Sequence, residues 1–303
     1  MKPVNGEARS AVVRSLAAAD GRTHRDAQTR RMEMIKISSL HKRFNTGTPN
    51  EVYALRGIDL EIKEGDFVTI IGTNGSGKST LLNAIAGTFL PDTGTVEIAG
   101  EDVTNKTDFQ RAKHIARVFQ NPFTGTAPGM TIAENLHMAY LRGRKAYPKI
   151  GLGTERRAVY REEVAQLEMQ LEDRLDNVIG VLSGGQRQAL TLLMAVLNQP
   201  KVLLLDEHTA ALDPKSAAQI IKLTKKFIER GNLTTFMVTH SMQQALDLGR
   251  HTIMMNKGEI IDDLTIEEKR RMTVNDLLEK FAHLRQAERL TDEMLAGLRR
   301  DYL

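Results

Sequence analysis

The segment "DFVTIIGTNGSGKSTLLNAIAG", at 66–87, constrains the fold of this chain more than any other part of the sequence. A continuous apolar run, typical of a strand buried on both faces, leads into a glycine-rich loop, and a helical pattern follows. The loop has the spacing G-x-x-x-x-G-K-[ST], filled by Gly72, Gly77, Lys78 and Ser79. An ordinary glycine turn is the alternative, but the strand before the loop and the helix after it favour a loop that wraps a phosphate chain.

Such a loop binds phosphate through backbone N–H groups that point inward, and glycines are needed where a Cβ would block the approach. The N-terminus of the following helix adds a favourable dipole. Lys78 is long enough to reach the outer phosphates, and the Ser79 hydroxyl is a suitable ligand for Mg²⁺. The sequence therefore predicts a site for a nucleoside triphosphate.

Hydrolysis of a triphosphate also needs a carboxylate for Mg²⁺ and a group that orients or activates water. The segment "KVLLLDE", at 201–207, supplies two adjacent acids after a buried strand. Asp206 ends the strand, where a carboxylate for Mg²⁺ is expected, and Glu207 is placed to polarise the attacking water. Adjacent acids after an apolar strand are costly unless a cation is near, which argues against a simple acidic surface turn.

Two further polar residues follow strand-like segments. His240 ends "TTFMVTH". A lone histidine is more often a satisfied polar group, but its place at the same sheet edge favours a contact with the γ-phosphate. Gln120 ends the shorter stretch "RVFQ", and taken alone it would mean little.

The order of the patterns predicts an α/β protein with a parallel, doubly wound sheet, because buried strands alternate with helices. "MIKISSL", "ALRGIDLEIKEG" and "GTVEIAGEDV" alternate apolar and polar residues and predict further strands. Residues 154–175 have a charged helical pattern, and "QALTLLMAVLNQP" predicts a buried helix. "TVNDLLEKFAHL", with Thr273 and Asp276 as a capping box, predicts a C-terminal helix packed on the domain, with a helix that binds a partner as the alternative.

Composition excludes several classes of protein. The chain has 303 residues and no cysteine, which excludes disulfides and thiolate metal sites. Its net charge is +4, with 42 basic and 38 acidic residues, and it lacks tryptophan, so nothing points to a nucleic-acid partner. No apolar run approaches the roughly 18 residues that cross a bilayer, so work at a membrane would require docking to another protein.

The segment 1–31 differs from the rest, with several arginines and few large apolar side chains. Three interpretations stay open: a disordered arm, a basic arm with a partner, and a start codon assigned too far upstream. We expect the main domain to begin near Met32.

Taken together, the motifs between about Ile35 and Asp262 resemble the nucleotide-binding subunit of ABC transporters. The sequence "LSGGQ", at Leu182–Gln186, lies between the phosphate loop and the acidic pair and is very specific for this family. Tyr53 matches the aromatic residue that stacks on adenine, and Gln120 matches the glutamine that senses Mg²⁺ and the γ-phosphate. The other residues that match the family's motifs are Gly72, Thr73, Asn74, Gly75, Ser76, Gly77, Lys78, Ser79 and Thr80 of the phosphate loop, Ser183, Gly184, Gly185 and Gln186 of the signature, the acids Asp206 and Glu207, Asp213 of the following loop, and His240.

The resemblance implies a P-loop NTPase (RecA-like) core with an antiparallel β subdomain and an α-helical signature subdomain at about 121–188. The ATP-binding domain would span 32–265 and a helical tail 266–303. The cofactors implied are ATP and Mg²⁺. Catalytic roles would fall to Glu207, His240 and Gln120, and Mg²⁺ would bind Ser79, Gln120 and Asp206.

In this family two copies pack head to tail, and each ATP lies between the phosphate loop of one copy and the signature of the other. This chain carries one of each, so the resemblance implies a homodimer with two sites. It also implies an integral-membrane permease with a substrate-binding protein as partners, no nucleic acid, and a peripheral location on the cytoplasmic face of the inner membrane. Within the family, the chain resembles the ATPases of bacterial uptake systems whose permeases are similar to the branched-chain amino acid and ribose type, some of them assigned to tryptophan. This resemblance implies uptake of an amino acid or a related small solute.

Two questions stay open from the sequence. An accessory ATPase of a soluble complex, similar to those that cleave phosphonates, is the alternative function. His208 follows Glu207 where many relatives have proline. It is either a neutral change within the subgroup or a titratable group near the γ-phosphate.

Overall fold

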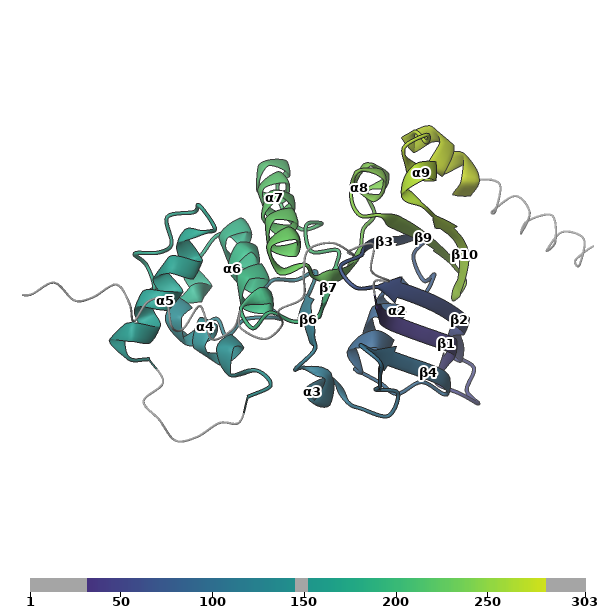
Figure 1. The fold of residues 1–303 in the computed structure, drawn as a ribbon, viewed down its shortest axis with the longest axis horizontal. Coiled ribbons are helices and arrows are strands. Elements are labelled where there is room, and N and C mark those ends of the chain that lie inside the picture. The colour runs from purple at the N-terminus through teal and green to yellow at the C-terminus, as the bar shows by residue number, and fades with distance from the viewer. Residues whose placement is uncertain (1–31, 145–151, 282–303) are drawn as a thin grey trace, which may run out of the picture. The chain divides into compact units, whose positions relative to one another are not determined.

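The structure, a computed structural model, describes residues 32–144 and 152–281. The predicted extension at 1–31 and the last part of the predicted tail, 282–303, lie outside the described residues. Two β-sheets form the framework (Figure 1). The six-stranded sheet has the order β10 (Glu259–Leu264), β9 (His251–Asn256), β3 (Phe67–Gly72), β8 (Thr234–Val238), β7 (Val202–Asp206) and β6 (Ile115–Val118). The four-stranded sheet has the order β2 (Val52–Lys63), β1 (Glu33–Phe44), β4 (Thr93–Ile98) and β5 (Glu101–Asp102).

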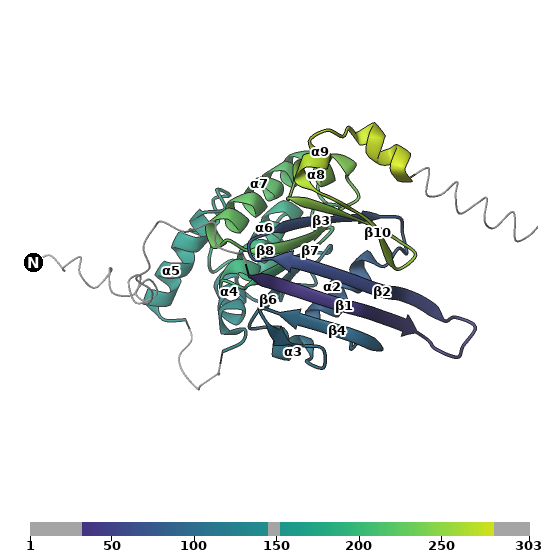
Figure 2. The same ribbon diagram turned by 45° about the vertical axis from the view of Figure 1, so that its right-hand side comes forward.

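Helices and the smaller sheet cover the two faces of the larger sheet, as Figures 1 and 2 show. One face packs against α6 and α7, and the other packs against α2 and the smaller sheet. The helices are α2 (Lys78–Ala86), α3 (Asp108–Arg111), α4 (Ile132–Leu141), α5 (Thr154–Ala165), α6 (Gly184–Val196), α7 (Pro214–Gly231), α8 (Met242–Asp247) and α9 (Ile266–Lys269), with a 3₁₀ turn at Ile179–Val181.

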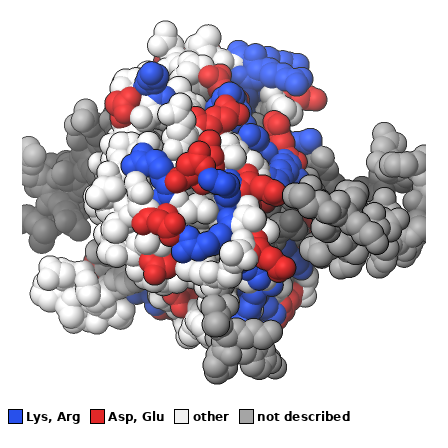
Figure 3. Space-filling view, turned by 90° about the vertical axis from the view of Figure 1, so that its left-hand side faces the viewer, with Lys and Arg blue, Asp and Glu red and all other residues white. Residues whose placement is uncertain are grey.

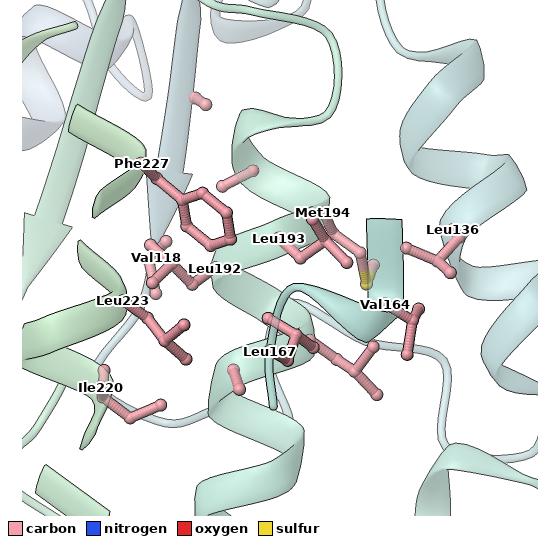
Figure 4. Packing of buried hydrophobic residues seen from close by; sticks show 14 of the residues in the cluster. Val118, Leu136, Val164, Leu167, Leu192, Leu193, Met194, Ile220, Leu223 and Phe227 are labelled. Atoms are coloured by element: carbon pink, nitrogen blue, oxygen red, sulfur yellow. The ribbon is translucent and has the colours of Figure 1, made fainter. Parts of the chain in front are cut away.

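Alternation along β7 explains why its sequence is continuously apolar. Leu203 and Leu205 belong to the cluster that α6 and α7 complete, part of which Figure 4 shows, whereas Val202 and Leu204 belong to the cluster under the smaller sheet. All four side chains are fully buried. A central strand covered on both faces has no solvent side to carry polar residues.

The parallel pairing of the central strands in the six-stranded sheet was predicted correctly. β3 lies parallel to β8 and β9, and β7 lies parallel to β8 and β6. The carboxyl ends of β3, β6, β7 and β8 therefore meet at one edge of the sheet, where ligands bind in folds of this kind. The smaller sheet is antiparallel, as the family resemblance implied.

Three predicted elements differ from the structure. The helical pattern at 154–175 is wrong in its second half, because α5 ends at Ala165 and the chain turns through Glu168 and Gln170, both with positive φ. β6 and β8 end two residues before Gln120 and His240, so neither side chain belongs to a strand. Both therefore sit on loops at the sheet edge.

Two helix predictions are confirmed. α6 is buried over most of its surface. The capping box at the C-terminal helix forms, since the Thr273 N–H donates to the Asp276 carboxylate at 2.6 Å and the Asp276 N–H donates to Thr273 Oγ1 at 3.3 Å. Leu277 of this helix, which spans 274–281 in the described part of the chain, is fully buried.

Surface charge is mixed around α5. Figure 3 shows acidic and basic side chains interspersed at the end of the molecule that carries this helix. Pairs such as Arg157 with Asp176, at 2.6 Å, are exposed and contribute little to stability. Within 32–144 and 152–281, every helix is too short or too polar to span a lipid bilayer.

Arg111 is a fully buried arginine that holds the far end of the phosphate-loop helix. Its Nη1 donates to Ala84 O at 2.7 Å and to Ile85 O at 2.8 Å, two carbonyls of the last turn of α2. Its Nε donates to Lys106 O at 2.9 Å, and Nη2 donates to Thr104 O at 3.2 Å. Burial lowers the pKa of Arg111 to about 10, which leaves it charged at neutral pH. A cation at a helix C-terminus also complements the dipole.

We predict that Arg111→Met lowers the free energy of unfolding by about 3 kcal/mol, because buried carbonyls lose a charged donor. Urea denaturation measures this change. Arg161→Met, which removes an arginine whose side chain is 60% exposed, is the control and should cost less than about 1 kcal/mol. Equal effects of the two substitutions would contradict the structural role of Arg111.

Candidate nucleotide site

The loop between β3 and α2 has the backbone that phosphate binding needs. Gly77 has φ of 100°, in the left-handed region, and a Cβ there would lie 2.7 Å from Ala54 O. A Cβ at Gly72 would lie 2.3 Å from Met255 O. Both positions therefore require glycine. α2 begins at Lys78, so its first N–H groups face the loop.

Lys78 is 5% exposed and folds back over the loop. Its Nζ donates to Thr73 O at 2.8 Å and to Gly72 O at 3.0 Å. Burial lowers the pKa of Lys78 from its ordinary value, and the carboxylates of Glu207 and Asp206 oppose that shift. The ammonium group is thus held at the mouth of the loop by backbone carbonyls and attracted by the acidic pair.

Asp206 has one partner for each carboxylate oxygen. The Ser79 hydroxyl donates to Oδ1 at 3.1 Å, and Arg117 Nη2 donates to Oδ2 at 2.9 Å. Two of the three residues predicted to bind Mg²⁺, Ser79 and Asp206, therefore lie together. Arg117 on β6 was missed from the sequence. The one available signal is its place on the strand next to β7.

Glu207 is the point where the polar side chains of this edge meet. It has φ of 47°, a strained conformation for glutamate, and its N–H donates to Val238 O at 3.1 Å. Gln120 Nε2 donates to one carboxylate oxygen at 3.1 Å, and His240 Nε2 lies 2.7 Å from the other. The structure brings the three residues predicted as catalytic into direct contact.

Tyr53 lies on β2 beside the phosphate loop, since the carbonyl of its neighbour Ala54 approaches Gly77. Its ring is flanked by the guanidinium groups of Arg43, at 4.3 Å, and Arg56, at 5.0 Å. Its hydroxyl pairs with His41. The ring is half-buried, and a base that stacks on it would have to share the ring with these arginines or displace one.

The signature residues begin α6. Ser183 is the N-cap, and its Oγ accepts from the Gln186 N–H at 3.3 Å while Gln186 Oε1 accepts from the Ser183 N–H at 3.2 Å. Gly184 and Gly185 form the first turn, whose N–H groups have no partner within a helix. A Cβ at Gly185 would lie 2.8 Å from Ser216 Oγ on α7. Asp213, the N-cap of α7, accepts from the Ser216 N–H at 3.0 Å.

The phosphate loop and the signature line different cavities. Thr73 and Asn74 line a cavity of about 610 Å³ together with His240 and the C-terminal helix. Ser183 and Gly185 line another of about 280 Å³ together with Gln170 and Ser216. The two cavities share no residue. Within one chain the structure does not bring the predicted nucleotide-binding residues into one site.

The surroundings of His208 distinguish the two interpretations that the sequence left open for it. It is 1% exposed, and its Nε2 lies 3.1 Å from Thr224 Oγ1 on α7. Burial lowers the pKa of His208 to about 4. The side chain is therefore an uncharged packing residue under α7, which favours the interpretation as a neutral change.

A largely parallel sheet whose edge carries a phosphate loop, a paired serine and aspartate, and a glutamate held by glutamine and histidine defines a P-loop nucleoside triphosphatase. Residues 55–210 match the ABC transporter family. The chain belongs to this family: it is an ATP-binding subunit of an ABC transporter, and it hydrolyses ATP in a reaction coupled to transport.

Individual relatives agree with this assignment. The chain is 43% identical over 253 residues to the tyrosine transport ATP-binding protein of Clostridioides difficile (strain R20291), which covers 82% of this chain and 99% of the relative. It is 34% identical to the probable sulfate/thiosulfate import ATP-binding protein CysA of Chlorella vulgaris, over 83% of this chain and 99% of that protein. Among solved structures, a dimeric ATP-binding cassette in a post-hydrolysis state bound to ADP and Pi has a TM-score of 0.65 and 33% identity, over 77% of this chain and 99% of that one.

We predict that His208 makes the folded protein sensitive to acid. Its pKa is about 4 in the folded protein and ordinarily 6.5, so the unfolded chain binds the extra proton between these values and stability falls as the pH falls through that range. His208→Gln keeps a donor for Thr224 but does not titrate. Unfolding free energies of the wild type should fall relative to the variant by roughly 3 kcal/mol between about pH 6.5 and pH 4.

A constant difference between the two proteins over that range would contradict the burial of an uncharged imidazole. The ATPase rate of His208→Gln should follow that of the wild type between about pH 6 and pH 8. A change in the shape of this dependence of the ATPase rate on pH would instead support a role for His208 near the γ-phosphate.

Proposed function

We propose that two copies of this chain bind two ATP molecules head to tail, each between the phosphate loop of one copy and the signature of the other. The observation that carries the proposal is that these two half-sites line separate cavities in one chain. The first-turn N–H groups of Gly184 and Gly185 are suited to a γ-phosphate, as the N-terminus of a helix favours anions. The similar cassette that is dimeric and bound to ADP and Pi supports the pairing of two copies.

Each polar residue at the sheet edge then has a role. Glu207 accepts a proton from the attacking water, and its contact with His240 at 2.7 Å and with Gln120 at 3.1 Å orients its carboxylate. His240 and Gln120 would contact the γ-phosphate. Lys78 neutralises charge on the outer phosphates. Tyr53 stacks on the adenine, and Asp213 fixes the loop that follows Glu207 next to the signature.

The residues present suit Mg²⁺. The Ser79 hydroxyl and the Asp206 carboxylate are hard oxygen ligands 3.1 Å apart, and Gln120 is the third residue proposed to reach the ion. In the described ranges no group of three or more His, Cys, Asp or Glu side chains could hold a metal ion by itself. When bound, Mg²⁺ would neutralise charge on the β- and γ-phosphates.

We also propose that the dimer drives uptake of an amino acid or a related small solute. The support is the names of the two relatives, a tyrosine transport protein and an import protein. The partners would be an integral-membrane permease, with its substrate-binding protein, and the dimer would be peripheral on the cytoplasmic face of the membrane. The same names favour transport over a role in a soluble phosphonate-cleaving complex.

We predict that Glu207→Gln reduces ATP turnover at least about 100-fold, because an amide cannot accept the proton of water. The amide retains the shape of the side chain, so ATP binding should persist and an ATP-bound dimer should accumulate. Steady-state turnover and analytical ultracentrifugation measure these two effects. Normal hydrolysis by the variant would contradict the role of Glu207.

We predict that Lys78→Ala weakens ATP binding at least about tenfold, because the outer phosphates lose a charged donor. Lys280→Ala, which removes an exposed lysine paired with Asp262, is the matched control and should bind ATP as the wild type does. Titration with a fluorescent ATP analogue compares the variants. Unchanged affinity in Lys78→Ala would contradict the assignment of the phosphate loop.

A further inference from the structure

Arg117 on β6 holds the carboxylate of Asp206 on the neighbouring strand β7. Its Nη2 donates to Asp206 Oδ2 at 2.9 Å, and the two side chains are 15% and 13% exposed. Its Nη1 donates to Asn83 Oδ1 on α2. Its Cζ lies 4.6 Å from the centroid of the Phe119 ring, which packs against the guanidinium. The cation is therefore fixed between α2, β6 and β7 and is largely shielded from water.

The contact uses the Asp206 oxygen that Ser79 leaves free. The Ser79 hydroxyl donates to Oδ1 at 3.1 Å, so both oxygens of the carboxylate are held. Residues that contact a metal ligand, and not the metal, set the orientation and the affinity of that ligand. Arg117 differs from an uncharged residue in this position, because it also cancels the charge of the carboxylate that a cation would use.

Arg117 also completes a balance of charge at this edge of the sheet. Lys78 and Arg117 are two cations, and Asp206 and Glu207 are two carboxylates that act on the Lys78 ammonium. These four side chains together carry no net charge. The affinity of a carboxylate site for a divalent cation depends on the charge of its ligands. A balanced group offers such a cation little attraction until a triphosphate adds negative charge.

We propose that Arg117 is a positioning residue of the Mg²⁺ site, which holds Asp206 and balances its charge so that the site accepts a divalent cation together with the nucleotide and not before it. This inference rests on the proposed function, because that function assigns Mg²⁺ to Ser79, Asp206 and Gln120. Once ATP is bound, its phosphates outweigh the single positive charge of Arg117. Without nucleotide, the guanidinium occupies one carboxylate oxygen and repels the ion from the other.

Binding of Mn²⁺ to the nucleotide-free, full-length chain tests this role, since Mn²⁺ takes the same oxygen ligands as Mg²⁺ and free Mn²⁺ is measured by EPR. Arg117→Gln keeps a donor for Asp206 and removes the charge, so it should bind Mn²⁺ at least about tenfold more tightly than the wild type. Arg117→Lys keeps the charge and should match the wild type. Asp206→Asn, added to Arg117→Gln, should abolish the gain, because the additional ion binds at Asp206.

Arg250→Gln is the matched control. Arg250 precedes β9, at the edge of the sheet opposite the phosphate loop, and its Nε lies 4.0 Å from Asp66 Oδ1. Removing this cation lowers the net charge of the chain by the same amount and should leave the Mn²⁺ affinity unchanged. If Arg117→Gln does not fold, Arg117→Met takes its place, because its apolar stem keeps the contact with Phe119, and it should also bind Mn²⁺ more tightly than the wild type.

The outcomes separate this inference from the proposed function. If Arg117→Gln binds Mn²⁺ no more tightly than the wild type, or if Arg117→Lys shows the same gain as Arg117→Gln, the charge of Arg117 does not control the site and the inference is wrong. The assignment of Mg²⁺ is tested in chains that retain Arg117. If Ser79→Ala and Asp206→Asn both leave the affinity for Mn²⁺ with ATP unchanged, that assignment is wrong and the inference falls with it.

Discussion

The site depends on the parallel pairing of four neighbouring strands, because this pairing brings their carboxyl ends to one edge of the sheet. β3 leads into the phosphate loop and β7 ends at Asp206. β6 and β8 lead within two residues to Gln120 and His240. Residues that are distant in the sequence therefore converge on Glu207, whose left-handed backbone turns its carboxylate towards both of them. The placement of the residues proposed for ATP hydrolysis therefore depends on the parallel strands and on the left-handed backbone of Glu207.

The same architecture limits what one chain can do. The phosphate loop offers a buried lysine and inward N–H groups, and the signature offers the first turn of α6, but they line separate cavities. In the signature, the side chains of Ser183 and Gln186 are already engaged in a capping box. What α6 has left to offer is the first-turn N–H groups of Gly184 and Gly185, which suit an anion supplied from elsewhere. On this account ATP joins two protein surfaces that each present only part of its binding site.

Local signals made much of the fold and site predictable from the sequence. Apolar runs identified β3, β7 and β8, and the glycine spacing identified the phosphate loop, because each signal lies within a few consecutive residues. The contacts that depend on distant segments were not predictable. Arg111 and Arg187 are surrounded by carbonyls from other elements, and His208 is buried by α7. The helical pattern at 154–175 failed because the chain turns at Glu168 and Gln170, whose positive φ values the sequence pattern does not reveal.

The most direct test of the composite site mixes two inactive variants. Lys78→Ala removes the phosphate-loop cation, and Gly184→Asp puts a negative charge at the signature, where a Cβ meets nothing closer than Leu212 at 3.6 Å. Each variant alone should be inactive. In an equal mixture, half of the dimers contain one intact site, so the ATPase rate should recover to about one quarter of the wild-type value. If a mixture shown to contain mixed dimers recovers no ATPase activity, that result contradicts the claim that each ATP is held by two chains.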